Sequence, residues 1–330
     1  MATDMRVLAT SLALAFAFGG PVAAQTAAPT TNWPDRPIRL VVGFTPGGAA
    51  DYVGRSVGDA LARALGQPVI IDNKPGAGSS LAADFVARAA PDGYTVLIAS
   101  PSAISVNPAI DPKRAPTAHS LVPVAKLTAS PLVVAANPQI GVKSIPELIA
   151  YAKKNPGKVN FAHAGMGSAP HLGGVLFNQL AGTDLTGIPF KGGGPSVQSV
   201  IAGDTQVTFA TPPSVLPQIK AGRLVGLGVT TADRFPLVPE LPGMKEAGLP
   251  NYRIDFWYGF FVPQGTPPEV VKKLFDAAQL ALQKPEVKAA LAREGTDVSP
   301  SSSPAEFASF VREENRFWAK LAKDSGAKAE

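Results

Sequence analysis

Short apolar runs alternate with segments of helical periodicity along most of the chain. The first run, 38–44, is continuously apolar, as in a strand buried on both faces, and it leads through glycines into a segment whose apolar residues recur every three or four positions. The resulting order β-α-β-α-β predicts a parallel sheet with right-handed crossovers. The predicted elements of this unit are strands at 38–44, 69–71 and 94–99, and helices at 51–65 and from a cap at Ser79 or Ser80 to Ala90.

The alternation restarts at Leu132 and is followed by a mostly helical C-terminal third. Strands are predicted at 132–136, 159–162, 186–190, 207–210, 224–229 and 256–262, and helices at 144–155, 170–180, 195–202 and 214–221. Capping boxes are predicted at Ser144–Glu147, Thr266–Glu269 and Ser303–Glu306. Two successive α/β units with a helical return indicate an α/β fold of two lobes, each a mostly parallel sheet flanked by helices, with a cleft between them.

The N-terminus has the pattern of a secretory signal peptide. Arg6 precedes the apolar run 7–20, and small residues at 22–24 provide a cleavage point before Gln25. The run is shorter than the roughly 20 residues that a membrane-spanning helix needs. We therefore expect 1–24 to be a signal peptide cleaved after Ala24, 25–32 to be a flexible leader, and the mature protein to be periplasmic.

Composition removes several classes of function. The 330 residues include no cysteine, which excludes disulfide frameworks, cysteine zinc sites and thiol nucleophiles and suits an oxidising compartment. The net charge of +5 is mild and no basic run is interleaved with aromatic residues, so we expect no nucleic-acid partner. A weakly positive protein does suit small anionic ligands.

Three glycine-rich loops, 45–48, 164–168 and 191–194, each lie between a predicted strand and a predicted helix. Such a junction presents unpaired backbone N–H groups and the positive end of a helix dipole, and glycine lets a ligand approach the backbone. Each loop alone can be an ordinary turn, but three together favour an anion-binding cleft. None completes a dinucleotide or triphosphate motif, so no nucleotide cofactor is expected.

Several single residues have two interpretations each. Asp51 and Arg55 are spaced for an ion pair within a helix, but Asp51 can also fix the loop that holds a ligand. His171 can donate to a bound carboxylate or make a structural hydrogen bond, and Lys191 can pair with an anion or lie on the surface. Trp257 can line a pocket or belong to a buried aromatic strand.

No catalytic constellation is evident. The sequence has no G-x-S-x-G, no H-E-x-x-H and no paired carboxylates typical of glycosidases, and His163 and His171 have no third metal ligand nearby. We therefore expect no catalytic residues, no metal and no cofactor. A secreted hydrolase or isomerase that uses the same cleft is the alternative of a different class.

Together, the motifs resemble those of the Bug, or TctC-like, family over essentially the whole mature chain. The matching segments are Trp33-Pro34 with Pro37-Ile38, Phe44-Thr45-Pro46-Gly47-Gly48-Ala49-Ala50-Asp51, Asn73-Lys74-Pro75-Gly76-Ala77-Gly78, Pro91-Asp92-Gly93-Tyr94-Thr95, 165–168 with His171, Phe190-Lys191-Gly192-Gly193, Gly203 with Phe209, Trp257-Tyr258-Gly259 and Pro263-Gln264-Gly265-Thr266-Pro267. Each segment is common, but the combination is specific.

The resemblance implies a type II periplasmic binding protein that serves a tripartite tricarboxylate transporter. The expected partners are a small carboxylate and two integral membrane subunits, with the receptor itself a monomer. Two crossing segments would join lobe 1, 33–131 plus 251–330, to lobe 2, 132–250. A receptor for a membrane sensor kinase is the alternative within the same fold.

The resemblance also places a ligand carboxylate between the loops at 45–48 and 164–168. The expected ligand-binding residues are Thr45, Pro46, Gly47, Gly48, Ala164, Met166, Gly167, Ser168, His171, Lys191, Gly192 and Trp257, supported from behind by Asp51 and Arg55. The chain departs from the family pattern at Ser199, where Asp is frequent, and at Gly54, where Ala is frequent. The identity of the ligand therefore does not transfer.

Overall fold

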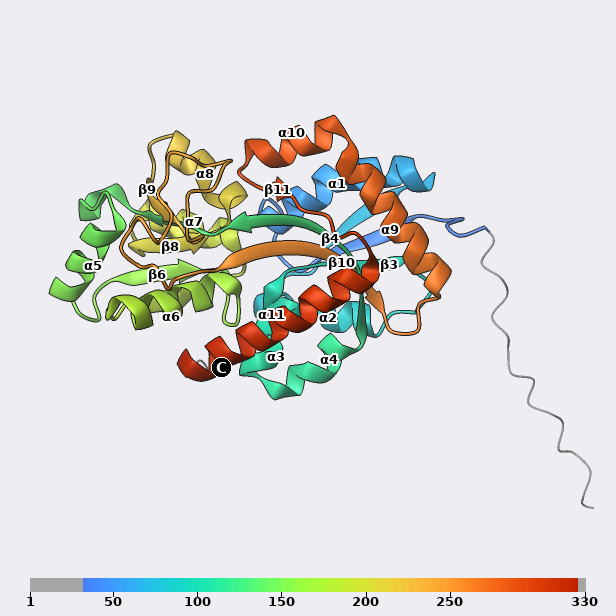
Figure 1. The fold of residues 1–330 in the computed structure, drawn as a ribbon, viewed down its shortest axis with the longest axis horizontal. Coiled ribbons are helices and arrows are strands. Elements are labelled where there is room, and N and C mark those ends of the chain that lie inside the picture. Colours follow the sequence, from blue (N-terminus) through green and yellow to red (C-terminus); the bar gives the residue numbers. More distant parts are fainter. Residues whose placement is uncertain (1–31, 326–330) are drawn as a thin grey trace, which may run out of the picture. The chain divides into compact units, whose positions relative to one another are not determined.

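The computed structural model describes residues 32–325, and their strands form two sheets (Figure 1). The predicted signal peptide and all of the predicted leader except Asn32 lie outside the described residues. The first sheet has the order β11-β4-β10-β3-β1-β2 and the second the order β7-β6-β8-β5-β9.

The first sheet begins with the predicted β-α-β-α-β unit. β1 pairs in parallel with β2 on one side and with β3 on the other, as expected. The strands of this sheet are β1 (Ile38–Val42), β2 (Val69–Asn73), β3 (Thr95–Ala99), β4 (Leu121–Pro131), β10 (Asp255–Pro263) and β11 (Asp297–Val298). β10 runs antiparallel to both β3 and β4, and β11 runs antiparallel to β4.

The second sheet is also mixed. Its strands are β5 (Val133–Ala136), β6 (Asn160–His163), β7 (Thr186–Pro189), β8 (Val207–Ala210) and β9 (Val225–Val229). β6 is parallel to β7 and β8, whereas β5 is antiparallel to β8 and β9. The expected two-sheet α/β fold is confirmed, and in each sheet one interior strand, β10 or β5, runs opposite to both of its neighbours.

The chain crosses between the two sheets twice. It passes from β4 to β5 through Leu132 and returns from β9 to β10 through 230–254. Thr230, which is fully buried, joins the two crossings: its hydroxyl oxygen accepts from the N–H of Leu132 at 2.7 Å and donates to the carbonyl oxygen of Ile254 at 2.8 Å. This single side chain ties together both connections between the sheets.

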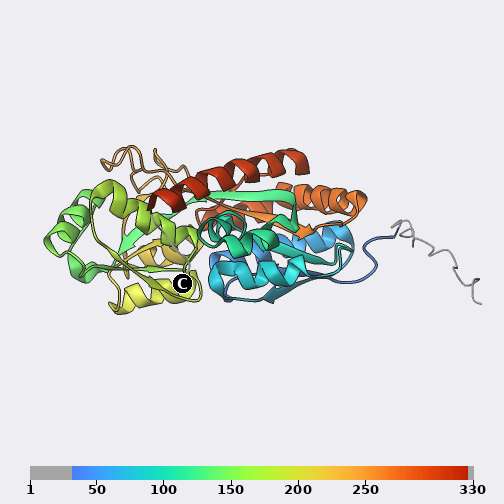
Figure 2. The same ribbon diagram turned by 90° about the horizontal axis from the view of Figure 1, so that it is seen from below.

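Helices cover the faces of both sheets (Figures 1 and 2). They are α1 (Ala49–Leu65), α2 (Ser80–Ala87), α3 (Asn107–Ile110), α4 (Ala115–His119), α5 (Ile145–Lys154), α6 (Ala169–Ala181), α7 (Gly193–Ala202), α8 (Pro212–Lys220), α9 (Pro268–Gln283), α10 (Pro285–Arg293) and α11 (Pro304–Ser325). α11, the red helix of Figure 2, packs on β4 of the first sheet and also contacts α6, which follows β6 of the second. Within 32–325, no helix is long and apolar enough to cross a membrane.

The helix ends test the predicted caps. Ser144 accepts a hydrogen bond from the N–H of Glu147, and Ser303 accepts one from Glu306, as the capping boxes predict. The Thr266 box is wrong, because the helix is capped by Pro267 and the Thr266 hydroxyl donates back to the carbonyl oxygen of Pro263. The second helix, α2, ends at Ala87 rather than Ala90, and no side chain caps its start.

Candidate functional site

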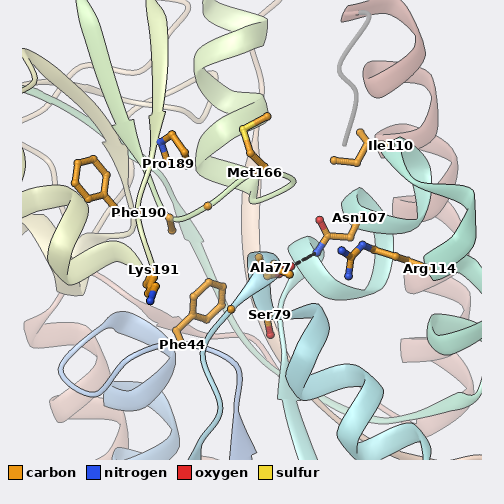
Figure 3. A pocket seen from close by; sticks show the side chains of 14 residues that line it. Phe44, Ala77, Ser79, Asn107, Ile110, Arg114, Met166, Pro189, Phe190 and Lys191 are labelled. Atoms are coloured by element: carbon orange, nitrogen blue, oxygen red, sulfur yellow. Dashed lines mark hydrogen bonds between the residues drawn. The ribbon is translucent and has the colours of Figure 1, made fainter. Parts of the chain in front are cut away.

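A cavity with a volume of about 340 Å³ lies between loops that belong to both sheets (Figure 3). Its lining combines apolar side chains with two cations and contains neither Asp nor Glu. The lining residues are Phe44, Gly76, Ala77, Gly78, Ser79, Asn107, Ile110, Arg114, Ala164, Gly165, Met166, Pro189, Phe190 and Lys191. The lining residues lie at or after the carboxyl ends of β1, β2, β3, β6 and β7, and each of these strands has a parallel neighbour. Open α/β sheets bind ligands at this end of their strands.

The loop 76–79 has an uncommon backbone. Four consecutive residues have positive φ, namely Gly76 at 136°, Ala77 at 47°, Gly78 at 57° and Ser79 at 75°. For the two non-glycine residues this conformation is unfavourable and persists only where surrounding contacts impose it. The contacts come from the buried amide of Asn107, whose Nδ2 donates to the carbonyl oxygens of Ala77 and Gly78 at 3.2 and 3.0 Å.

Glycine allows the loops of the two sheets to approach each other at the cavity. A Cβ on Gly78 would lie 2.7 Å from the carbonyl oxygen of Met166, and a Cβ on Gly167 would lie 1.8 Å from Oδ1 of Asn107. Both glycines also have positive φ. The close packing of 76–79 against 165–167 therefore depends on residues without side chains.

A smaller cavity of about 20 Å³ shares Phe44 and Ala164 with the larger one. Four helix N-termini border it: Gly48, Ala49 and Ala50 at α1, Pro170 at α6, Gly193 at α7, and Thr211 with Ser214 at α8; Ala164, Ala210, Ser102, Phe256 and Tyr258 complete the lining. At α1 and α7 the first N–H groups have no partner within the helix. In the first turns of α6 and α8, by contrast, prolines lack an N–H and the other N–H groups donate to Ser102, Ser168 and Thr211. The dipoles of all four helices add positive potential. This small cavity thus has the electrostatics of an anion site.

Asp51 holds the loop 45–48 from behind. Its Oδ2 accepts from the N–H of Gly47 at 3.0 Å and from Nε of Arg55 at 2.9 Å, and its Oδ1 accepts from Nδ2 of Asn73 at 3.1 Å. Burial alone would raise the pKa of Asp51, but the hydrogen bonds from Arg55, Gly47 and Asn73 outweigh it, so the pKa lies below its usual value. Both sequence interpretations of Asp51 are therefore realised, the ion pair and the loop anchor.

The predicted site residues fall into three groups. Ala164, Met166 and Lys191 line the larger cavity, and Gly48 and Ala164 line the smaller one. Thr45, Pro46, Gly47, Gly167, Ser168, His171 and Gly192 lie in or next to the same loops but line neither cavity. The N–H of Gly47 donates to Asp51.

His171 and His163 form a buried pair of neutral imidazoles. Their ring centroids lie 4.6 Å apart, and Nδ1 of His171 has no hydrogen-bond partner among the residues that the structure describes. Burial lowers the pKa of His171 to about 4. Burial and the neighbouring His171 lower the pKa of His163 to about 3, against a weaker opposing effect of the Gly165 backbone. Neither ring carries a charge at neutral pH with which to attract an anion.

Trp257 faces away from both cavities. It is almost fully buried, its Nε1 donates to Glu314 at 2.9 Å, and its ring packs on Phe307 and Phe310. Successive side chains of a strand alternate between faces, so its neighbours Phe256 and Tyr258 line the smaller cavity instead.

Sequence reasoning missed the residues that follow β2 and β3. Ala77 and Ser79 come from a segment predicted only as a loop and a cap, and Asn107, Ile110 and Arg114 come from a stretch without predicted elements. The glycines of the Asn73-Lys74-Pro75-Gly76-Ala77-Gly78 motif were the one signal that could have marked the first group. Among residues 32–325, no cluster of three or more His, Asp or Glu side chains is arranged to hold a metal.

Comparison with known proteins decides the family. The sequence model described as "Tripartite tricarboxylate transporter family receptor" matches residues 53–327. The chain belongs to this family. Protein BugT of Bordetella pertussis is 35% identical over 313 residues, which cover 93% of each chain.

Solved structures agree with this family assignment. The periplasmic binding protein BugD aligns with a TM-score of 0.86 at 30% identity, covering 90% of this chain and 100% of BugD. MatC from Rhodopseudomonas palustris, solved with bound malate, aligns with a TM-score of 0.83 at 35% identity, covering 88% of this chain and 99% of MatC. The expected family and the expected periplasmic-binding-protein fold are thereby confirmed, and the family is one of solute-binding transport receptors.

Proposed function

We propose that this protein captures a small organic carboxylate in these two adjacent cavities and delivers it to two integral membrane subunits of a tripartite transporter. It would act in the periplasm as a monomer, after cleavage of the signal peptide. The observation that carries the proposal is the convergence of four helix N-termini on the smaller cavity. The proposal includes no catalytic step, since neither cavity is lined by a carboxylate pair or by a histidine.

The carboxylate would bind in the smaller cavity, against the first turn of α1. Gly48 is the N-cap there, and the first intrahelical bond runs from the N–H of Tyr52 to the carbonyl oxygen of Gly48. The N–H groups of Ala49 and Ala50 precede this bond and both residues line the cavity, so they can donate to an anion. This replaces the expected contact with Gly47, whose N–H is bound to Asp51.

The remainder of the ligand would occupy the larger cavity. Phe44, Ile110, Met166 and Phe190 offer apolar contacts to a carbon chain or ring. Figure 3 shows Arg114 and Lys191 on opposite sides of this space, each carried by a different sheet's loops. A second acidic group on the ligand would meet one of these cations, which fits the malate bound by the related MatC.

The lobes would move relative to each other when the ligand binds. We assign lobe 1 to 33–131 plus 251–330 and lobe 2 to 132–250, with the crossings at Leu132 and 230–254 as the hinge. Cavity-lining loops come from both lobes, so closure would enclose the ligand and shield its charge from water. The closed, loaded form would be the one that the membrane subunits recognise.

Native mass spectrometry of the protein purified from the periplasm of its native host tests the proposal. We expect a fraction of the protein to carry an additional mass, and release of that mass under denaturing conditions should yield an organic acid. A thermal-shift screen of carboxylates should then raise the Tm with the same acid. Protein that carries no acid and is not stabilised by any carboxylate in the screen would contradict the proposal.

A further inference from the structure

Exposed apolar side chains gather at one edge of the first sheet. Ile70 on β2 is 55% exposed, and Leu81 and Phe85, one turn apart on α2, are 52% and 38% exposed. Side chains of this size are normally buried, and an exposed group of them marks an interaction surface more often than a single one does.

Cationic side chains lie among these apolar residues. Arg39 on β1 is the register partner of Ile70, and its guanidinium lies 6.0 Å from the centroid of the Phe85 ring. Nζ of Lys74 lies 4.4 Å from the same centroid. We call Arg39, Ile70, Lys74, Leu81 and Phe85 the β2–α2 face.

The face has a surplus of positive charge. Asp72 is the acid that pairs with both cations, at 3.7 Å from Arg39 and 3.3 Å from Lys74. One carboxylate therefore serves two cations, and Arg88, exposed at the end of α2 seven residues after Leu81, adds a third. An acidic partner with apolar side chains would complement this surface.

The strand beneath the face is a sheet edge. β2 is the last strand of the first sheet and pairs with β1 alone among the described strands. The backbone N–H of Lys74 donates to the carbonyl oxygen of Val42 on β1. Since backbone N–H groups point alternately to the two sides of a strand, those of Ile71 and Asn73 point away from β1, toward the open side of the sheet. An open edge is a template for an extended protein segment, and this favours a protein partner over a lipid surface.

The same segment reaches the ligand site. Lys74 belongs to the face, and only Pro75 separates it from the loop 76–79, which lines the larger cavity and touches Met166 of the second sheet's loop. The strained backbone of 76–79 is held in place by Asn107. A shift of the loop 76–79 when a ligand enters the cavity would thus also move the β2–α2 face, because the few residues between them have a constrained backbone.

We propose that the β2–α2 face docks an extended, acidic segment of a membrane subunit of the transporter. The segment would add a strand to β2 and place apolar side chains on Ile70, Leu81 and Phe85 and carboxylates near Arg39 and Lys74. The inference rests on the proposed function, which supplies the class of partner.

Photo-crosslinking in living cells tests the docking site. The full-length protein, expressed in its native host, carries p-benzoylphenylalanine in place of Phe85 or, as a control, of Leu280, which is 52% exposed on α9. Irradiation should link position 85, and not position 280, to an integral membrane protein that mass spectrometry identifies as a subunit of the transporter. Adducts only with lipid, with soluble proteins or with a second copy, or equal adducts at both positions, would overturn the proposal.

A matched pair of substitutions adds a second readout. Ile70→Asp places a negative charge on the face, and Leu280→Asp places one at an equally exposed site elsewhere. Ile70→Asp should reduce the adduct at position 85 at least tenfold, while Leu280→Asp should leave it unchanged. Calorimetric titration with malate and other carboxylates should give the same affinities for both variants and the wild type. Undiminished crosslinking in Ile70→Asp would contradict the docking site alone, whereas absence of carboxylate binding in the wild type would contradict the proposed function.

Discussion

The carboxylate of Asp51 accepts a hydrogen bond from the backbone N–H of Gly47 at 3.0 Å. This bond turns the N–H into the protein and fixes the loop 45–48 at the point where α1 begins. The loop thus presents the first turn of α1, rather than its own glycine, to the smaller cavity. The position of a buried carboxylate behind the loop explains why an acidic residue can serve an anion site without touching the anion.

Replacing Asp51 by alanine should weaken both the fold and ligand binding. The N–H of Gly47, an exposed residue, and Nδ2 of the half-buried Asn73, which also donates to the carbonyl oxygen of Phe44, would each lose an acceptor, at a cost of about 0.5–1.5 kcal/mol for each hydrogen bond. We expect the Tm to fall by several degrees and carboxylate affinity to fall with it. Arg55→Ala is the control: it removes only the half-exposed partner of Asp51, so the loss should stay near 1 kcal/mol. Equal effects of the two variants would show that the ion pair, not the loop anchor, matters.

Gly78→Ala should prevent the close approach of the two glycine loops. Its Cβ would lie 2.7 Å from the carbonyl oxygen of Met166, so the loops must separate. Small-angle scattering with saturating ligand should give a larger radius of gyration for this variant than for the wild type. Gly141→Ala is matched in strain, with φ of 73° and no atom within 4 Å of the added Cβ, and it should scatter like the wild type. A Gly78→Ala protein that closes normally would remove this contact from the closure mechanism.

Arg114 should discriminate between ligands with one and with two acidic groups. Arg114→Gln keeps a polar side chain at the cavity wall but removes the charge, and a lost charge-assisted hydrogen bond costs about 1.5–3 kcal/mol, roughly ten- to a hundredfold in affinity. We expect this loss for dicarboxylates in calorimetric titrations and little change for monocarboxylates. Lys113→Gln, which alters an exposed neighbour outside the cavity lining, is the control. A uniform loss for all acids would contradict a role in discrimination.

The buried histidine pair should make the protein acid-sensitive. The folded pKa values of about 3 and about 4 lie below the usual 6.5, so the unfolded chain binds protons that the native state excludes. The contribution of the neutral histidines to the free energy of unfolding is therefore fully present above pH 6.5. It falls as the pH drops toward 4, by about 1.4 kcal/mol per pH unit for each histidine. Urea unfolding from pH 7.5 to pH 4.5 measures this slope. His163→Leu should make it clearly shallower, and an unchanged slope would assign the acid sensitivity to other groups.

Much of the fold follows from hydrophobic patterning, and the main omission has a physical reason. Most strands and helices begin and end within a few residues of the predicted positions, because continuous apolar runs and helical periodicity reflect burial directly. β4 escaped prediction because Pro123 interrupts it and because Thr128 and Ser130 are buried polar residues in its core-facing pattern. The directions of β5 and β10 were not predicted either, because hydrophobic periodicity does not encode whether a strand runs parallel or antiparallel to its neighbours.

The candidate site was predictable where glycine marks a strand end and not where tertiary contacts create it. The loops with Gly48 and Ala164 were found because their glycines follow apolar strands. Asn107 and Arg114 come from short helices without periodicity, and only the fold brings them to the cavity. Trp257 was assigned to the pocket from its chemistry, although strand alternation at 256–258 places the neighbouring rings there instead.

The converging helix N-termini should select negative charge. Isothermal titration of the mature protein with malate and a panel of other carboxylates, each paired with its neutral amide, measures this selectivity directly. We expect at least one acid to bind and its amide to bind at least a hundredfold more weakly, because two or more charge-assisted hydrogen bonds of about 1.5–3 kcal/mol each would be lost. Amides that bind as tightly as the corresponding acids would contradict the account.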